Sequence, residues 1–267
     1  MASLFTLMPA GAGPIPLERL EAAAETEDVL VDCLIDEELY WLRVGEAADP
    51  VYDEPYLSGL SERARAVALD SGLRALIAKG MVDVDPDEPE SVEILGVYGL
   101  LSNCRRQARS VTRVLLEVGD DPSIRFAYHR ISDTLVLTEE VSHDGFHDFA
   151  FQSLDSAASG LSSIFDRRRT AGAESGDHRR AVGPGELDPS PEMLRRAASH
   201  VVSVSGGHAL RGGTGGEVGL TVYGTDDGVW AHWVEPGAAA PHVVARTGAP
   251  DLFVLANDAI VGRPSGP

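Results

Sequence analysis

Residues 111–151 read VTRVLLEVGDDPSIRFAYHRISDTLVLTEEVSHDGFHDFAF, and this stretch decides the fold class. Apolar residues recur at every second position in several short segments, and Phe149 and Phe151 share one face of the last segment. Turns at Ser132-Asp133 and at 143–145 separate the later segments. The pattern is typical of an antiparallel β-meander. The predicted strands are 111–118, 124–129, 134–141 and 146–151.

Helical patterns lie on both sides of the meander. The clearest begins at Ser61, a good N-cap, and ends at Gly80. The stretch 28–44 alternates like a strand at first, and a turn at Asp36-Glu37-Glu38 would make it a hairpin, which we favour over a helix end. Further helices are predicted at 17–25, 91–101, 154–165 and 191–199, further strands at 81–84, 200–205, 218–223, 229–234 and 243–246, and either a strand or a helical turn at 252–256. We therefore expect an α+β fold, an antiparallel sheet with helices packed on it.

Residues 167–190 contain Gly and Pro and lack apolar periodicity, which is typical of a linker or a long surface loop. They divide an α+β domain at 1–166, made of a hairpin, two helices, the meander and a closing helix, from a smaller β-rich module at 191–267. The order of elements is compatible with two distant versions of one α+β unit, although no repeat of residues shows the relation.

The chain is strongly acidic, with a formal net charge of −20. This charge opposes binding to nucleic acid, since phosphate contacts need clustered Lys and Arg. Residues 1–100 hold 21 acidic and 6 basic residues, so the acidity is concentrated near the N-terminus. Such a surface is either a docking face for a basic partner or a solubilising surface.

Composition and the ends of the chain suggest where the protein resides. Lys79 is the one Lys among 22 basic residues, and there are 28 Gly, as in proteins from GC-rich genomes such as those of actinobacteria. The segment MASLFTLMPAGAGPIP has no Lys or Arg, so it lacks the charged region of a signal peptide. No run of about 18 apolar residues predicts a membrane span. Cys33 and Cys104 have no metal or disulfide spacing. We expect a cytoplasmic protein without membrane insertion.

The candidate partner-binding residues are few. They are the acidic triplet Asp36, Glu37 and Glu38, for which a solvated turn is the alternative, and Trp230 and Trp233. In the segment VWAHWV the two Trp face opposite sides of a strand, so we expect at least one of them to be partly exposed, where it would suit a protein-binding patch. Packing of both in the core is the alternative.

No pattern in the sequence predicts a catalytic, cofactor-binding or metal-binding residue. His143 and His147 are four residues apart, but Gly145 between them favours a turn with surface histidines over a helical metal pair. The segment RGGTGG at 211–216 lacks the ending of a phosphate-binding loop, so a hairpin loop is expected. The acidic residues at 83–90 lack the spacing of a calcium loop.

The segment from about 60 to 165 resembles the middle of the EspG family, the chaperones of type VII secretion. The resemblance lies in LRALIAKGMV, in SVEILGVYGLL and in the strands with VLLEV, RFAYHR and LVLTEEV. It implies two related α+β halves around a central sheet, a secreted protein as partner and no catalysis. The last third departs from the family by being β-rich, and no binding residue is carried over by position.

These observations favour a cytoplasmic, chaperone-like adaptor that binds another protein, either a secreted substrate or a basic partner. An enzyme whose site assembles in space around the histidines is an alternative. A winged-helix regulator is another, suggested by the helix and strand near 76–84, although the charge opposes it.

Overall fold

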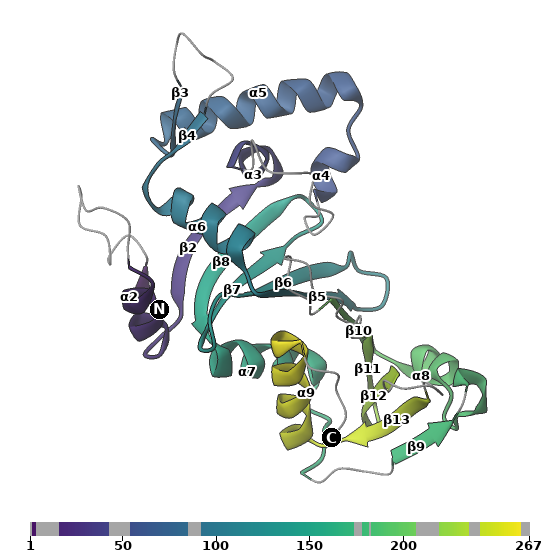
Figure 1. Ribbon diagram of the computed structural model, residues 1–267. Helices are drawn as coiled ribbons and strands as arrows, with labels where there is room; N and C mark the ends of the chain where they lie inside the picture. The colour runs from purple at the N-terminus through teal and green to yellow at the C-terminus, as the bar shows by residue number, and fades with distance from the viewer. Residues whose placement is uncertain are drawn as a thin grey trace. The chain divides into compact units, whose positions relative to one another are not determined.

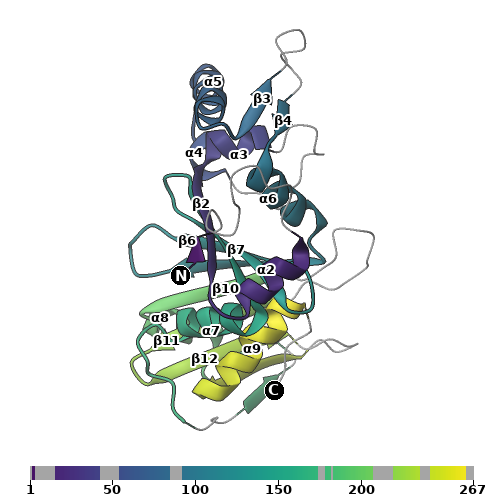
Figure 2. The same ribbon diagram turned by 90° about the vertical axis from the view of Figure 1, so that its left-hand side faces the viewer.

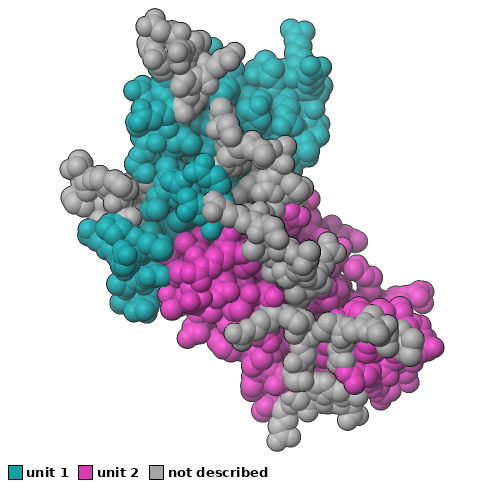
Figure 3. Space-filling model, in the orientation of Figure 1, with its two compact units in different colours: residues 1–107, 137–152 teal, residues 108–136, 153–267 magenta. Residues whose placement is uncertain are grey.

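The computed structural model describes residues 2–3, 16–42, 54–84, 92–173, 178–181, 183–206, 219–234 and 241–262. The chain forms two compact units (Figure 3). Unit 1 comprises residues 1–107 and 137–152, and unit 2 comprises residues 108–136 and 153–267. Each unit is therefore discontinuous in the sequence, whereas the predicted domains follow one another along the chain. Both units combine helices with strands, which confirms the α+β class (Figure 1).

Unit 1 holds a sheet with the strand order β1-β2-β8-β7. Strand β2 is parallel to β1 and antiparallel to β8, and helices α2 and α3 contact β2. Helix α5 packs on α3, as Figure 1 shows. The bounds are β1 (Ala2–Ser3), α2 (Leu17–Ala24), β2 (Val29–Ile35), α3 (Asp36–Leu42), α4 (Pro55–Ser58), α5 (Glu62–Ala78), β3 (Val82–Val84), β4 (Val92–Ile94), α6 (Gly96–Gln107), β7 (Leu135–Val141) and β8 (Phe146–Ser153).

Two local predictions for unit 1 need correction. The residues expected to form the turn of a hairpin begin helix α3 instead, because Leu39 and Leu42, three positions apart, bury one helical face. The helix expected from Ser91 begins only at Gly96, since residues 92–94 form strand β4 and pair with β3. The helix predicted from Ser61 is confirmed, with the Ser61 hydroxyl accepting the hydrogen bond of the Ala64 N–H at 3.4 Å.

Unit 2 holds an antiparallel sheet with the order β6-β5-β10-β11-β12-β13-β9. Helices α7 and α9 pack side by side on one face (Figure 2), and α8 lies on the opposite face. The bounds are β5 (Ser110–Glu117), β6 (Ile124–Arg130), α7 (Leu154–Phe165), β9 (His178–Ala181), a 3-10 helix η1 (Pro184–Glu186), α8 (Pro191–Ala197), β10 (His200–Gly206), β11 (Leu220–Thr225), β12 (Gly228–Val234), β13 (His242–Thr247) and α9 (Ala249–Val261).

The larger core of unit 2 lies between its sheet and the helix pair. Fully buried Leu161, Phe165 and Ile260 of the helices meet Val202 and Val222 of the strands. Both helices begin at N-cap positions next to a strand end, Ser153 for α7 and Gly248 for α9. Residues 252–256, for which a strand or a helical turn was expected, lie inside helix α9. The segment predicted as a linker, 167–190, contains β9 and η1.

The order of elements repeats along the chain. The series α6-β5-β6-β7-β8-α7 is followed by α8-β10-β11-β12-β13-α9. Within unit 2, the first strands of the two series, β5 and β10, pair antiparallel, and the two closing helices, α7 and α9, pack together. The repetition supports the interpretation of two related halves, which the residues alone do not reveal.

Candidate functional site

Asp36 connects several elements of unit 1. It directly follows strand β2 and begins helix α3, where a carboxylate interacts favourably with the positive end of the helix dipole. Its Oδ2 accepts the backbone N–H groups of Tyr56 at 2.8 Å and Leu57 at 3.0 Å, so it caps the single turn of α4. Its own N–H donates to the carbonyl oxygen of Gly145 at 2.9 Å. Asp36 is completely buried.

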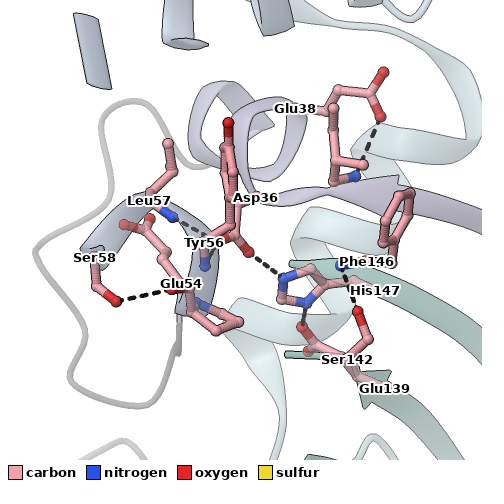
Figure 4. A network of polar contacts seen from close by, with 12 residues as sticks. Asp36, Glu38, Glu54, Tyr56, Leu57, Ser58, Glu139, Ser142, Phe146 and His147 are labelled. Carbon is pink, nitrogen blue, oxygen red and sulfur yellow. Dashed lines mark hydrogen bonds and ion pairs between the residues drawn. The ribbon is translucent and has the colours of Figure 1, made fainter. Parts of the chain in front are cut away.

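His147 lies between two carboxylates, as Figure 4 shows. Its Nε2 is 2.7 Å from Asp36 Oδ1, and its Nδ1 is 2.7 Å from Glu139 Oε1. An imidazolium donates from both ring nitrogens and carboxylates accept, so this arrangement favours the protonated ring. Burial alone would lower the pKa of His147, but the hydrogen bonds and charges of Asp36 and Glu139 outweigh burial and raise it.

Arg105 completes the buried network. Its guanidinium donates to Glu139 Oε1 at 3.1 Å and lies over the ring of Phe149, 5.6 Å from the centroid. The network then contains two cations and two carboxylates, and none of the four side chains is more than 5% exposed. Such pairing is the condition under which charges are tolerated inside a protein.

Gly145 allows the turn that brings His147 to Asp36. Its φ is +79°, a conformation that residues with a Cβ rarely adopt. A Cβ on Gly145 would lie 2.7 Å from Tyr56 Cβ and 2.9 Å from Asp36 Cγ. The segment HDGFH is therefore a tight turn that delivers one histidine to a buried position.

The two histidines of that segment have different surroundings. His143 is exposed, with its Nε2 3.2 Å from Asp144, as expected for a surface histidine. His147 was expected at the surface as well, and that expectation is wrong, because the carboxylates of Asp36 and Glu139 compensate its charge inside unit 1. Among the described residues, no three His, Cys, Asp or Glu side chains are placed to hold a metal ion.

The three acidic candidates differ in burial and in their partners. Asp36 and Glu38 are buried in place of forming an exposed turn, and Glu38 pairs with Lys79 at 2.5 Å. Glu37 is partly exposed and forms no ion pair within the described chain. Burial, followed by the neighbouring charges of Asp36 and Glu38, raises the pKa of Glu37.

Glu37 lies in a groove of about 540 Å³ on unit 1. Helices α3, α4 and α5 and the residues between the last two form it. Val67 is 64% exposed and Tyr56 is 42% exposed, although both are large and apolar. The lining residues are Glu37, Tyr56, Leu60, Ser61, Arg63, Ala64, Val67, Ala68 and Ser71.

Gly72 lies where α5 crosses α3, next to Ser71 of the groove lining. A Cβ on Gly72 would lie 2.7 Å from the backbone of Glu37, so a glycine is needed for α5 to cross α3 this closely. Along α5, only Gly72 and Leu76 are fully buried, and most of the helix faces outward. Helix α5 therefore contributes more residues to the groove lining than to the buried core.

One of the two tryptophans is partly exposed, as expected. Trp233 is 4% exposed and belongs to the core under α7 and α9. Trp230 lies on the other face of β12, where it is half-buried against the cluster under α8. The opposite orientation of the two side chains agrees with the alternation along the strand. His232 on the same face stacks on His242, with ring centroids 5.3 Å apart.

Two predicted features lie outside the described residues. They are the Gly-rich segment 211–216 and most of the acidic cluster at 83–90. Within the described part of the chain, no helix is both long enough and apolar enough to cross a membrane.

Comparison with known proteins gives little further guidance. No family model matches the chain, and no curated protein matches it. One similar solved structure is the Mycobacterium tuberculosis type VII secretion system chaperone EspG5 in complex with a PE25-PPE41 dimer. That match has 12% sequence identity and a TM-score of 0.49, and it covers 90% of this chain and 98% of the other. At this level the match identifies neither a family nor a partner for this chain.

The groove is the part of the site that sequence reasoning missed. Its lining joins Glu37 of α3 to residues of α4 and α5 between positions 56 and 71. No pattern in the sequence predicts that these helices meet. One signal was available. The helix beginning at Ser61 has apolar Val67 and Leu76 on opposite faces, so it carries apolar residues beyond those that one buried face needs.

Proposed function

We propose that this protein is an adaptor that binds another protein, and that the groove on unit 1 is its binding surface. The observation that supports this is the exposure of Tyr56 and Val67 beside the partly exposed carboxylate of Glu37. Exposed apolar side chains that line a hollow and are rimmed by polar groups are typical of protein interaction sites.

The alternative of an enzyme centred on the histidines finds less support. His147 and both carboxylates that hold it are nearly inaccessible, so a substrate would not reach them without unfolding part of unit 1. The groove itself contains Glu37 and Arg63 as its charged groups and two serines, and no histidine is among its described lining residues. A binding role accounts for the exposed apolar and charged side chains of the groove.

We further propose that the partner is a secreted protein and that the adaptor acts in the cytoplasm. A secreted partner and a cytoplasmic location rest on the resemblance of residues 60–165 to secretion chaperones. The identity of the captured partner tests both.

The experiment is affinity capture with mass spectrometry, using three forms of the full chain. The wild type is compared with Val67→Lys, which places a charge in the groove, and with Ile77→Lys, a matched change at an apolar residue of α5 that is 46% exposed and lies outside the groove lining. We expect one partner to be retained by the wild type and by Ile77→Lys and lost by Val67→Lys. Equal retention by all three forms would exclude the groove, and no specific partner for any form would exclude the adaptor function.

A further inference from the structure

We propose that the groove binds an amphipathic helix of a second protein, and that this helix places a Lys or Arg side chain against the Glu37 carboxylate. The proposal rests on the adaptor function above and specifies the chemistry of the partner. It follows from the shape of the groove and from the charges of the described residues around it.

The walls of the groove favour a helix over an extended peptide. They come from α3, α4, α5 and the two residues before α5, so the lining contains no strand edge to which a peptide strand would add. Ala64, Ala68 and Ser71 follow one another along α5 at helical spacing, and such small side chains let a second helix approach closely. Val67 and Tyr56 provide the apolar contacts beside that stripe.

Charge complementarity identifies the basic residue. Both neighbours of Glu37 already have cationic partners, since Asp36 pairs with His147 and Glu38 pairs with Lys79. Glu37 has no such partner in the described chain, although it is partly buried between them. A carboxylate in this position gains from a cation supplied by a bound molecule, because the apolar surroundings strengthen the attraction.

The raised pKa of Glu37 supports the same conclusion. Burial is its largest cause and the charges of Asp36 and Glu38 come next, so the ionised form is disfavoured while the groove is empty of a cation. An ammonium or guanidinium group beside Glu37 would reverse this effect. Arg63, also in the lining and without an ion pair in the described chain, would meet an acidic residue of the same helix.

A second copy of this chain is the competing occupant. Its net charge of −20 makes association of two copies electrostatically unfavourable. A basic, amphipathic helix has the opposite charge and does not meet this repulsion. The proposal therefore commits to a different protein as the partner.

The test uses a phage-displayed library of amphipathic helical peptides of about four turns. The library is selected on the wild-type chain, on Glu37→Gln, on Glu37→Lys and on Val67→Lys, with Ile77→Lys as the matched control. Glutamine keeps the size of the side chain, so the close contact of Glu37 with Gly72 is preserved. Circular dichroism melting of each variant verifies that it is folded.

We expect peptides selected on the wild type and on Ile77→Lys to share one Lys or Arg position beside an apolar stripe. Selection on Glu37→Lys should exchange that position for Asp or Glu, and selection on Val67→Lys should yield no common pattern. A peptide selected on the wild type should bind Glu37→Gln about tenfold more weakly or worse, the range for a hydrogen bond to a charged group.

Three outcomes would overturn the proposal. These are a failure to select any groove-dependent peptide, a basic position that persists on Glu37→Lys, and a dimer in light scattering that Val67→Lys abolishes. If affinity capture yields a partner that Val67→Lys loses while the library shows no preference for basic residues, the adaptor function stands and this inference falls. If capture yields no partner, the adaptor function itself falls.

Discussion

Asp36 uses both of its carboxylate oxygens inside unit 1. One oxygen accepts two backbone N–H groups at the start of α4, and the other accepts a hydrogen bond from His147. Tyr56, whose N–H is held in this way, also lines the groove. The buried charges therefore fix the position of one wall of the proposed binding surface, although they do not face a partner themselves.

Replacement of the imidazolium tests this role. We expect His147→Gln to lower the free energy of unfolding by about 3–5 kcal/mol, because it leaves two buried carboxylates without the cation between them. Urea unfolding followed by circular dichroism measures the change. His143→Gln, at an exposed residue of the same turn, should stay within about 0.5 kcal/mol of the wild type. Equal losses in the two variants would contradict the assignment.

The same network predicts a dependence of stability on pH. The pKa of His147 is raised above its ordinary value of 6.5 in the folded protein, so the bound proton stabilises the fold. This contribution is fully present below about pH 6.5 and is lost as the pH rises through the raised pKa. The stability difference between wild type and His147→Gln should therefore be constant below about pH 6.5 and narrow as the pH rises from there through the raised pKa. A constant difference across this range would argue that the ring is neutral.

At the scale of elements, the sequence predicts those helices and strands that caps and apolar alternation determine locally. The cap at Ser61 predicted α5, the alternation over 111–151 predicted the strands, and the helix predicted at 154–165 is α7. Helix α3 was missed because Asp and Glu occur both in turns and in the first turn of a helix. The burial of Leu39 and Leu42 decides for the helix, and the carbonyl of Gly145, more than a hundred residues away, binds the N–H of Asp36 where the helix begins. The groove was missed because no local pattern predicts that residue 37 lies beside residues 56–71. Glu37 itself was among the candidate residues.

The crossing of α3 and α5 gives a prediction for one element pair. Gly72→Ala places a Cβ 2.7 Å from the backbone of Glu37, so it should destabilise the fold by about 1–3 kcal/mol and widen the groove. Gly160→Ala in α7 is the matched control, since nothing lies within 4 Å of its Cβ. That variant should stabilise the fold by about 0.5–1 kcal/mol through better helix propensity. Thermal and urea unfolding of both variants decide, and equal effects would show that α5 has room to move away from α3.

At the scale of the whole molecule, acidity and the groove have separate roles. The acids of the first hundred residues were predicted to form either a docking face or a solubilising surface, and two members of the triplet at 36–38 are buried and paired. The net charge of −20 belongs to the whole chain and acts at a distance, without contact with a partner. Such a field acts on the rate of encounter with a basic protein, while contacts in the groove act on the rate of dissociation.

This division predicts how binding of the captured partner responds to salt. Raising NaCl from about 20 mM to about 500 mM should slow association about tenfold or more and change dissociation little, because screening weakens long-range attraction first. Glu18→Lys with Glu25→Lys, two exposed positions of unit 1 outside the groove lining, should slow association at low salt without changing dissociation. Val67→Lys should instead speed dissociation. Biolayer interferometry resolves the two rates, and a double variant that speeds dissociation would place α2 and its surroundings inside the interface.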